Sequence, residues 1–150
     1  MRDPGLVIET DIGYDPDDYL MLLHLLMRNV PIHALLLSPG HPSQVALCRF
    51  LFAQMGIPAP LIGGADRAHW TGRPINRMHQ GFMARPLGPR ELWTDGPGHE
   101  LARAALQEHP EAVLFVCGPP LNAGRLFSQY PDQRVWAYAP TAYAGDGKRS

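Results

Sequence analysis

Short, uninterrupted apolar segments alternate along this chain with longer segments of helical periodicity. The apolar segments have the length of β-strands and fall at residues 6–8, 32–37, 61–62, 112–117 and 135–138. The helical signals fall at residues 16–29, 43–55, 98–109 and 121–130. Strands that are apolar on both faces are typical of a parallel sheet that helices cover on both sides. The sequence therefore predicts an α/β fold with a mostly parallel sheet and helices on both faces.

Length and composition agree with one domain. The chain has 150 residues, of which 45% are hydrophobic and 18% are charged, and this is enough to bury a core. Prolines and glycines gather between the third strand and the third helix, so we expect a long loop excursion at residues 65–97. We predict a single α/β domain over residues 1–150.

Charge and hydropathy argue against two classes of partner. The net charge of -1 gives no electrostatic reason to expect nucleic acid, because proteins that bind it usually carry a basic face. The longest apolar stretch, 19–27, is interrupted by a histidine and is far shorter than the ~20 residues of a membrane span. Cys48 and Cys117 sit in apolar segments without CxxC spacing, so we expect two buried thiols in a reducing compartment. With no signal-peptide core visible, we expect a cytoplasmic protein that binds neither nucleic acid nor membranes.

Five carboxylates fall within ten residues at the end of the first predicted strand. They are Glu9, Asp11, Asp15, Asp17 and Asp18. In an open parallel sheet, ligands bind outside the carboxyl ends of the strands. The loops at 38–41, 62–66 and 117–122 should face the same edge. The carboxylates therefore mark the place at which we expect a functional site.

Two interpretations of these carboxylates compete. In the structural one, Asp15 is the N-cap of a helix that starts at Pro16, and Asp17 and Asp18 favour the positive end of that helix. This leaves Asp11 unexplained. In the functional one, Asp11, Asp17 and Asp18 converge on a hard cation, Ca²⁺ or alternatively Mg²⁺, which removes the repulsion between them.

The segment TDIGYDPDDYLMLL resembles the N-terminal signature of the inosine-uridine-type nucleoside hydrolases. That signature is an Asp-rich strand end of the form D-x-D-x-G-x-D-D, followed by an apolar helix. Glu9 stands at the first Asp position, and Asp11 and Gly13 match the second Asp and the Gly. Asp17 and Asp18 match the final pair, after two inserted residues.

Three further segments resemble this family in the same order. They are PIHALLLSPG (31–40), GIPAPLIGGADR (56–67) and HPEAVLFVCGPPLNAGRLFSQYP (109–131). Together the matching segments cover nearly the whole chain and about the first half of the family's catalytic domain. The resemblance thus implies a nucleoside-hydrolase-like fold that lacks the C-terminal half.

The resemblance also implies an activity, the hydrolysis of N-glycosidic bonds in ribonucleosides. Asp11 would bind Ca²⁺ and take a proton from the attacking water. Asp18 would be a bidentate Ca²⁺ ligand, and Leu121 would add its main-chain carbonyl. Asp17 would bind a ribose hydroxyl, and Asn122 would be a second substrate contact. The implied partner is a nucleoside or another small molecule that contains ribose.

Other interpretations stay open at this point. His41 borders the predicted site, where it is either a substrate contact or a surface loop residue. The chain could be a non-catalytic half-domain that keeps a ribose or metal pocket. It could also be a haloacid-dehalogenase-like Mg²⁺ phosphatase, with Glu9 at the position of the nucleophilic Asp. A truncated parallel sheet leaves an unpaired edge, so we expect a homo-oligomer or a partner chain.

Overall fold

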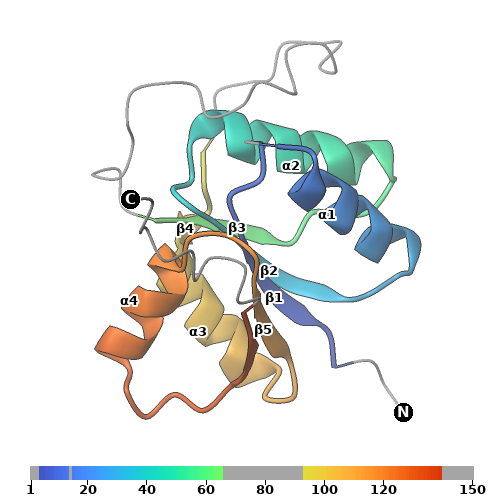
Figure 1. The fold of residues 1–150 in the computed structure, drawn as a ribbon. Helices are drawn as coiled ribbons and strands as arrows, with labels where there is room; N and C mark the ends of the chain where they lie inside the picture. Colours follow the sequence, from blue (N-terminus) through green and yellow to red (C-terminus); the bar gives the residue numbers. More distant parts are fainter. Residues whose placement is uncertain (1–3, 14, 66–92, 140–150) are drawn as a thin grey trace, which may run out of the picture.

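The computed structural model describes residues 4–13, 15–65 and 93–139 (Figure 1). Its elements are β1 (Leu6–Thr10), α1 (Asp17–Met27), β2 (Ile32–Leu37), α2 (Pro42–Gln54), β3 (Leu61–Gly64), β4 (Gly96–Pro97), α3 (Gly98–Glu108), β5 (Val113–Val116), α4 (Leu121–Gln129) and β6 (Trp136–Tyr138). The strands in these ranges form one sheet in the order β4-β3-β2-β1-β5-β6, and all of its pairs are parallel. The predicted α/β fold with a parallel sheet is confirmed.

Helices cover both faces of this sheet. α1 and α2 pack on one face, and α3 and α4 pack on the other (Figure 1). Successive residues of the inner strands point to opposite sides. Ile8 and Leu35 belong to the core with α1 and α2, whereas Val7 and Leu36 belong to the core with α3 and α4. This two-sided burial explains why the strands are apolar without alternation. No helix within the described ranges has the length and apolar character to cross a membrane.

The chain adds strands to β1 in two directions. β2, β3 and β4 extend the sheet on one side, and β5 and β6 extend it on the other. The topological switch point therefore lies between β1 and β5, where open α/β sheets leave a crevice for ligands. The register pairs Glu9 with Val116. The residues just beyond these strands, Asp11 and Gly118, consequently emerge in contact with each other.

The start of α1 differs from its sequence prediction. Pro16 occupies the N-cap position, and no side chain accepts a hydrogen bond there. The prediction that Asp15 caps this helix is therefore wrong. Asp17 Oδ1 instead accepts the backbone N–H of Asp18 at 2.8 Å. The backbone N–H of Asp18, which an N-cap side chain would otherwise accept, is thus accepted by the Asp17 side chain in the first turn of the helix.

The expected excursion at residues 65–97 is described only at its two ends, because residues 66–92 lie outside the described ranges. At the far end, Gly96–Pro97 forms β4, a short strand beside β3 that the sequence does not predict. Asp95 holds this end in place, since its Oδ2 accepts the N–H of Ile62 at 2.7 Å. The backbone N–H of Asp95 also donates to the Ile62 carbonyl oxygen at 2.7 Å, so Asp95 joins β4 to β3 through both its backbone and its side chain.

The two cysteines are free thiols. Cys48 of α2 is fully buried, and burial raises the pKa of its thiol to about 12. Cys117 follows β5 and is only partly buried. The expected burial is therefore complete for Cys48, while Cys117 stands at the edge of the sheet where the carboxylates lie.

Candidate functional site

Two carboxyl groups, those of Asp11 and Asp18, lie together between the end of β1 and the start of α1. Asp11 is half-buried, and only 7% of the surface of Asp18 is exposed. Burial raises the pKa of Asp11 to about 7, and the charge of Asp18 adds to this rise. Burial also raises the pKa of Asp18. The protonated Asp11 carboxyl hydrogen-bonds the Asp18 carboxylate, so the pair keeps one proton close to neutral pH when no cation is bound.

Neighbouring groups hold Asp18 in place. Thr10 Oγ1 donates a hydrogen bond to Asp18 Oδ2 and accepts the backbone N–H of Ile12 at 3.0 Å. The Cys117 thiol lies within hydrogen-bonding reach of Asp18, and its Sγ is 3.1 Å from the carbonyl oxygen of Glu9. Burial, helped by the charge of Asp18, raises the pKa of Cys117. The thiol is therefore neutral, and it donates its proton to the carbonyl oxygen of Glu9.

Glu9 is fully buried one residue before Thr10, where it points toward α4. Its Oε1 accepts the Ser38 hydroxyl at 2.6 Å and the Asn122 backbone N–H at 2.7 Å. Its Oε2 accepts the backbone N–H of Ala123 at 2.9 Å. Burial raises the pKa of Glu9, and these donors oppose the rise. The carboxyl group thus joins the end of β2 to the N-terminus of α4, where free N–H groups favour an anion.

Gly118 brings the loop after β5 against the carboxylate pair. A Cβ atom at this position would lie 2.6 Å from the backbone nitrogen of Asp11 and 2.8 Å from its Oδ1. Real side chains do not approach other atoms so closely, so only glycine permits this contact. The same loop leads to Leu121, the first residue of α4. Leu121, whose main-chain carbonyl the resemblance implies as a ligand, therefore follows directly after the loop that contacts Asp11.

Asp17 lies at the rim of the site. It is exposed at the first position of α1, next to Asp18 in the chain. Its hydrogen bond with Asp15 lowers its pKa, so its carboxylate is ionised at neutral pH. The structure thus brings Asp11 and Asp18 together, whereas Asp17 stands exposed next to Asp18 in the chain.

Asn122 faces the interior rather than the rim. It is 1% exposed, and its Nδ2 donates to Glu9 Oε1 at 3.0 Å and to the Leu37 carbonyl oxygen at 3.1 Å. This amide nitrogen secures α4 against β1 and β2. A substrate contact by Asn122 would require this buried side chain to become accessible, and that contact stays a prediction.

His41 is the N-cap of α2, a role that neither sequence alternative named. Its Nδ1 accepts the N–H of Ser43 at 3.1 Å, and Gln44 Oε1 accepts the N–H of His41 at 3.0 Å, which makes a capping box. Gln44 Nε2 donates to the Ile12 carbonyl oxygen at 3.2 Å and so ties this loop to the loop after β1. Burial lowers the pKa of His41. Its contact with substrate stays a prediction.

The donors around the pair are those that a hard cation prefers. Carboxylate oxygens of Asp11 and Asp18 and nearby main-chain carbonyls suit Ca²⁺ or Mg²⁺. A cation would take the place of the shared proton and remove the repulsion between the two charges. Within the ranges that the structure describes, no three His, Cys, Asp or Glu side chains are grouped to hold a metal ion. Carbonyl oxygens, water and substrate hydroxyls would have to complete the coordination.

No family model, curated protein or solved structure matches this chain. Any assignment of function therefore depends on the carboxylate pair, on the groups that orient it and on the signature that surrounds it in the sequence. Sequence reasoning missed most of the orienting groups, which are Thr10, Ser38, Gln44 and Cys117. Glu9 was predicted in part. Its place at the first Asp of the signature identified it as a carboxylate of the site, but nothing in the sequence indicated that it is buried.

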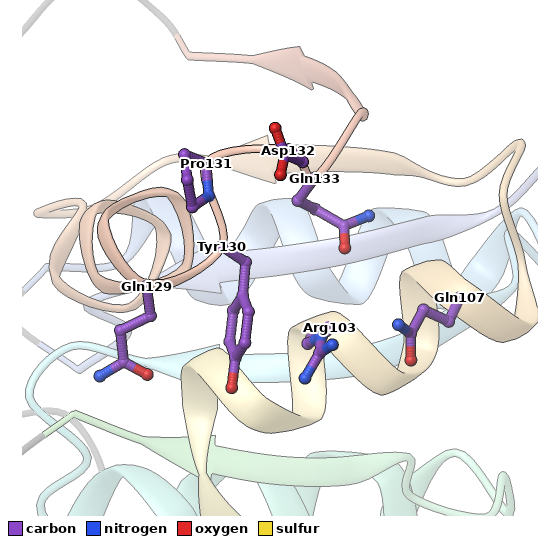
Figure 2. Close-up of a pocket in the computed structure, with 7 residues that line it drawn as sticks. All are labelled: Arg103, Gln107, Gln129, Tyr130, Pro131, Asp132 and Gln133. Carbon is purple, nitrogen blue, oxygen red and sulfur yellow. The ribbon is translucent and has the colours of Figure 1, made fainter.

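A pocket of about 300 Å³ lies elsewhere, between the ends of α3 and α4 (Figure 2). Its lining residues are Arg103, Gln107, Gln129, Tyr130, Pro131, Asp132 and Gln133. The Arg103 guanidinium lies 3.9 Å from the centroid of the Tyr130 ring, and Tyr130 Oη donates to Glu100 at 2.7 Å. The pocket contains none of the residues that the sequence predicts for the site. We therefore place the candidate site at the carboxylate pair.

Proposed function

We propose that this chain is a nucleoside-hydrolase-like enzyme that cleaves N-glycosidic bonds of ribonucleosides with the help of Ca²⁺. The observation that carries the proposal is the contact between Asp11 and Asp18 at the switch point of the sheet, with the pKa of Asp11 raised to about 7. A divalent cation that displaces the shared proton would leave Asp11 ionised, which is the form that accepts a proton from water. The signature TDIGYDPDD around the pair supports the same reaction class by its resemblance to the nucleoside hydrolases.

The proposal gives each residue of the site a role. Asp11, Asp18 and the Leu121 carbonyl would hold Ca²⁺. When bound, the ion supplies positive charge that orients vicinal ribose hydroxyls and makes a nearby water easier to deprotonate. Asp11 accepts the proton of that water. Asp17 accepts a hydrogen bond from a ribose hydroxyl at the rim, and the carboxylates together stabilise the positive charge that develops on the sugar.

The phosphatase alternative has no support in the geometry. It requires Glu9 to attack a phosphate as a nucleophile. The Glu9 side chain is fully buried, and hydrogen bonds from Ser38, Asn122 and Ala123 occupy both of its oxygens. A substrate phosphate cannot reach it without opening the contact between β1 and α4.

Turnover tests the proposal directly. The full chain is incubated with Ca²⁺ and a panel of purine and pyrimidine ribonucleosides, and release of free base and reducing sugar is measured. We expect release by the wild-type chain and a loss of about 10²–10⁴-fold in Asp11→Asn, because general-base catalysis contributes this much. Asp132→Asn is the control, since Asp132 is an exposed carboxylate remote from the pair.

Two outcomes would contradict the proposal in different ways. If Asp11→Asn releases base at the wild-type rate, Asp11 is not the base. If the wild-type chain binds Ca²⁺ and ribose without releasing base, the non-catalytic ribose-binding alternative holds instead.

A further inference from the structure

The hydroxyl group of Thr10 has a fixed direction beside the carboxylate pair. Its oxygen accepts the backbone N–H of Ile12 at 3.0 Å, and the same oxygen donates to Asp18 Oδ2. A threonine hydroxyl has a single proton to donate, so this proton is committed to Asp18. Thr10 is 1% exposed, and bulk water therefore does not compete for either bond.

This bond restricts how the Asp18 carboxylate can turn. Asp18 sits in the first turn of α1, and rotation about its side-chain bonds would otherwise let it face the free N–H groups of the helix. With Oδ2 held by Thr10 and the Cys117 thiol within hydrogen-bonding reach, the carboxylate instead meets Asp11.

We infer that Thr10 is a positioning residue, whose hydroxyl holds the Asp18 carboxylate against Asp11 and thereby sets the affinity of the pair for a divalent cation. The cation part of this inference rests on the proposed function. Hydrogen bonds that orient a ligand from outside the coordination sphere change metal affinity about 10–100-fold when they are removed. Thr10 is the donor that matches this description, because it donates to Asp18 and is the last residue of β1, directly before Asp11.

Ser38 provides a matched control for the loss of a buried hydroxyl. Like Thr10 it is 1% exposed and stands at the end of an inner strand. Its hydroxyl also donates to a carboxyl group, at 2.6 Å, but to Glu9 and not to a member of the pair. A purely structural effect should appear in both substitutions, whereas a positioning effect should appear only at Thr10.

The test compares the full wild-type chain with Thr10→Val, Thr10→Ser and Ser38→Ala. Calorimetric titration with Ca²⁺ at one pH gives the affinity, and the ¹³C chemical shift of the Asp18 carboxyl carbon reports the hydrogen bonding and protonation state of that group. We expect Thr10→Val to bind Ca²⁺ about 10–100-fold more weakly and to move the Asp18 signal. Thr10→Ser should restore both, and Ser38→Ala should lower the melting temperature without changing the affinity.

An equal Ca²⁺ affinity in Thr10→Val and wild type overturns the inference. A loss in Ser38→Ala as large as that in Thr10→Val also overturns it. If the wild-type chain binds no Ca²⁺, the proposed function fails. The ¹³C signal of Asp18 alone then tests whether the Thr10 hydroxyl holds the Asp18 carboxylate. An unchanged signal in Thr10→Val rejects that role, and a signal displaced in Thr10→Val but not in Thr10→Ser supports it. If Thr10→Val does not fold, Thr10→Ala makes the same comparison.

Discussion

Glu9 Oε2 accepts a 2.9 Å hydrogen bond from the backbone N–H of Ala123, although 114 positions separate the two residues in the chain. The bond joins the central strand β1 to the first turn of α4. Through its other oxygen, the same carboxyl group holds Ser38 at the end of β2. Free N–H groups at a helix start favour a negative charge. Glu9 is therefore an internal anchor for two of the loops that surround the carboxylate pair.

Glu9→Gln should destabilise the fold. The amide nitrogen of glutamine would place a donor against groups that already donate, which are Ser38, Asn122 and Ala123. We expect a loss of about 1–3 kcal/mol in the free energy of unfolding, measured with urea. Glu108→Gln is the control, because its side chain is 79% exposed. Equal unfolding midpoints for Glu9→Gln and wild type would contradict the anchoring role.

Two glycines of one region should respond in opposite directions to the same substitution. Gly118→Ala forces a Cβ atom to 2.6 Å from the Asp11 nitrogen. We expect this variant to lose about 1–3 kcal/mol in its free energy of unfolding. Gly124 lies within α4 with nothing within 4 Å of its added Cβ atom. There the alanine should add about 0.5–1 kcal/mol of stability, because glycine is a poor helix former. Thermal unfolding of both variants measures the difference, and a stabilising Gly118→Ala would refute the close contact.

Stability should depend on pH through Asp11. Its folded-state pKa, about 7, exceeds its ordinary value of 3.8, so the folded chain keeps a proton that the unfolded chain loses between these values. In metal-free buffer, stability should fall as pH rises from about 4 to about 7. Asp11→Asn removes this penalty. We expect the free energy of unfolding of the variant to exceed that of wild type by about 1 kcal/mol at pH 8 and to equal it at pH 4. The expected difference is small because solvent partly screens the carboxyl group.

Differential scanning calorimetry at the two pH values measures this gain. Asp132→Asn serves as the control, since its carboxylate is exposed and lies outside the pair. A melting temperature of Asp11→Asn that stays parallel to wild type across the pH range would show that the pKa of Asp11 is not raised.

Calcium should stabilise the folded chain by mass action. A ligand that binds only the folded state adds about 2.7 kcal/mol at a concentration of about 100 times its Kd. We expect this rise in the wild-type chain and its absence in Asp18→Ala, which removes a buried member of the pair. Thermal shift with increasing Ca²⁺ measures it, and Mg²⁺ in parallel shows which ion the site prefers. An identical rise in Asp18→Ala would place the binding elsewhere.

The edge strand β6 should promote association between chains. Its Trp136 and Tyr138 are 76% and 57% exposed, and edge strands with apolar side chains pair readily with other chains. We expect sedimentation velocity to show a concentration-dependent oligomer, and Trp136→Glu to shift it toward the monomer. Leu20→Glu, at a 57% exposed position on α1, should not. A monomer at every concentration would remove β6 as an interface.

Much of the fold could be predicted from local patterns alone. The segment at Ile32–Leu37 forms β2 with the predicted bounds, and its last four residues are buried between the two layers of helices. The position of Asp11 at a strand end, and its approach to Asp18 across one turn, also followed from short-range sequence. A connection of a few residues between a strand and a helix leaves little choice of arrangement.

The remaining features depended on strand order, which no local pattern encodes. The sequence alone fixed the parallel α/β class and placed acidic side chains at the end of β1. Only the tertiary structure decided that β5 adjoins β1, and with it the contact of Gly118 with Asp11 and the burial of Glu9 against Ala123. It also decided that Asp15 does not cap α1. The periodicity of apolar residues predicts which side of a helix or strand is buried. Hydrogen bonds between residues far apart in the chain depend on how the helices and strands pack, which this periodicity does not predict.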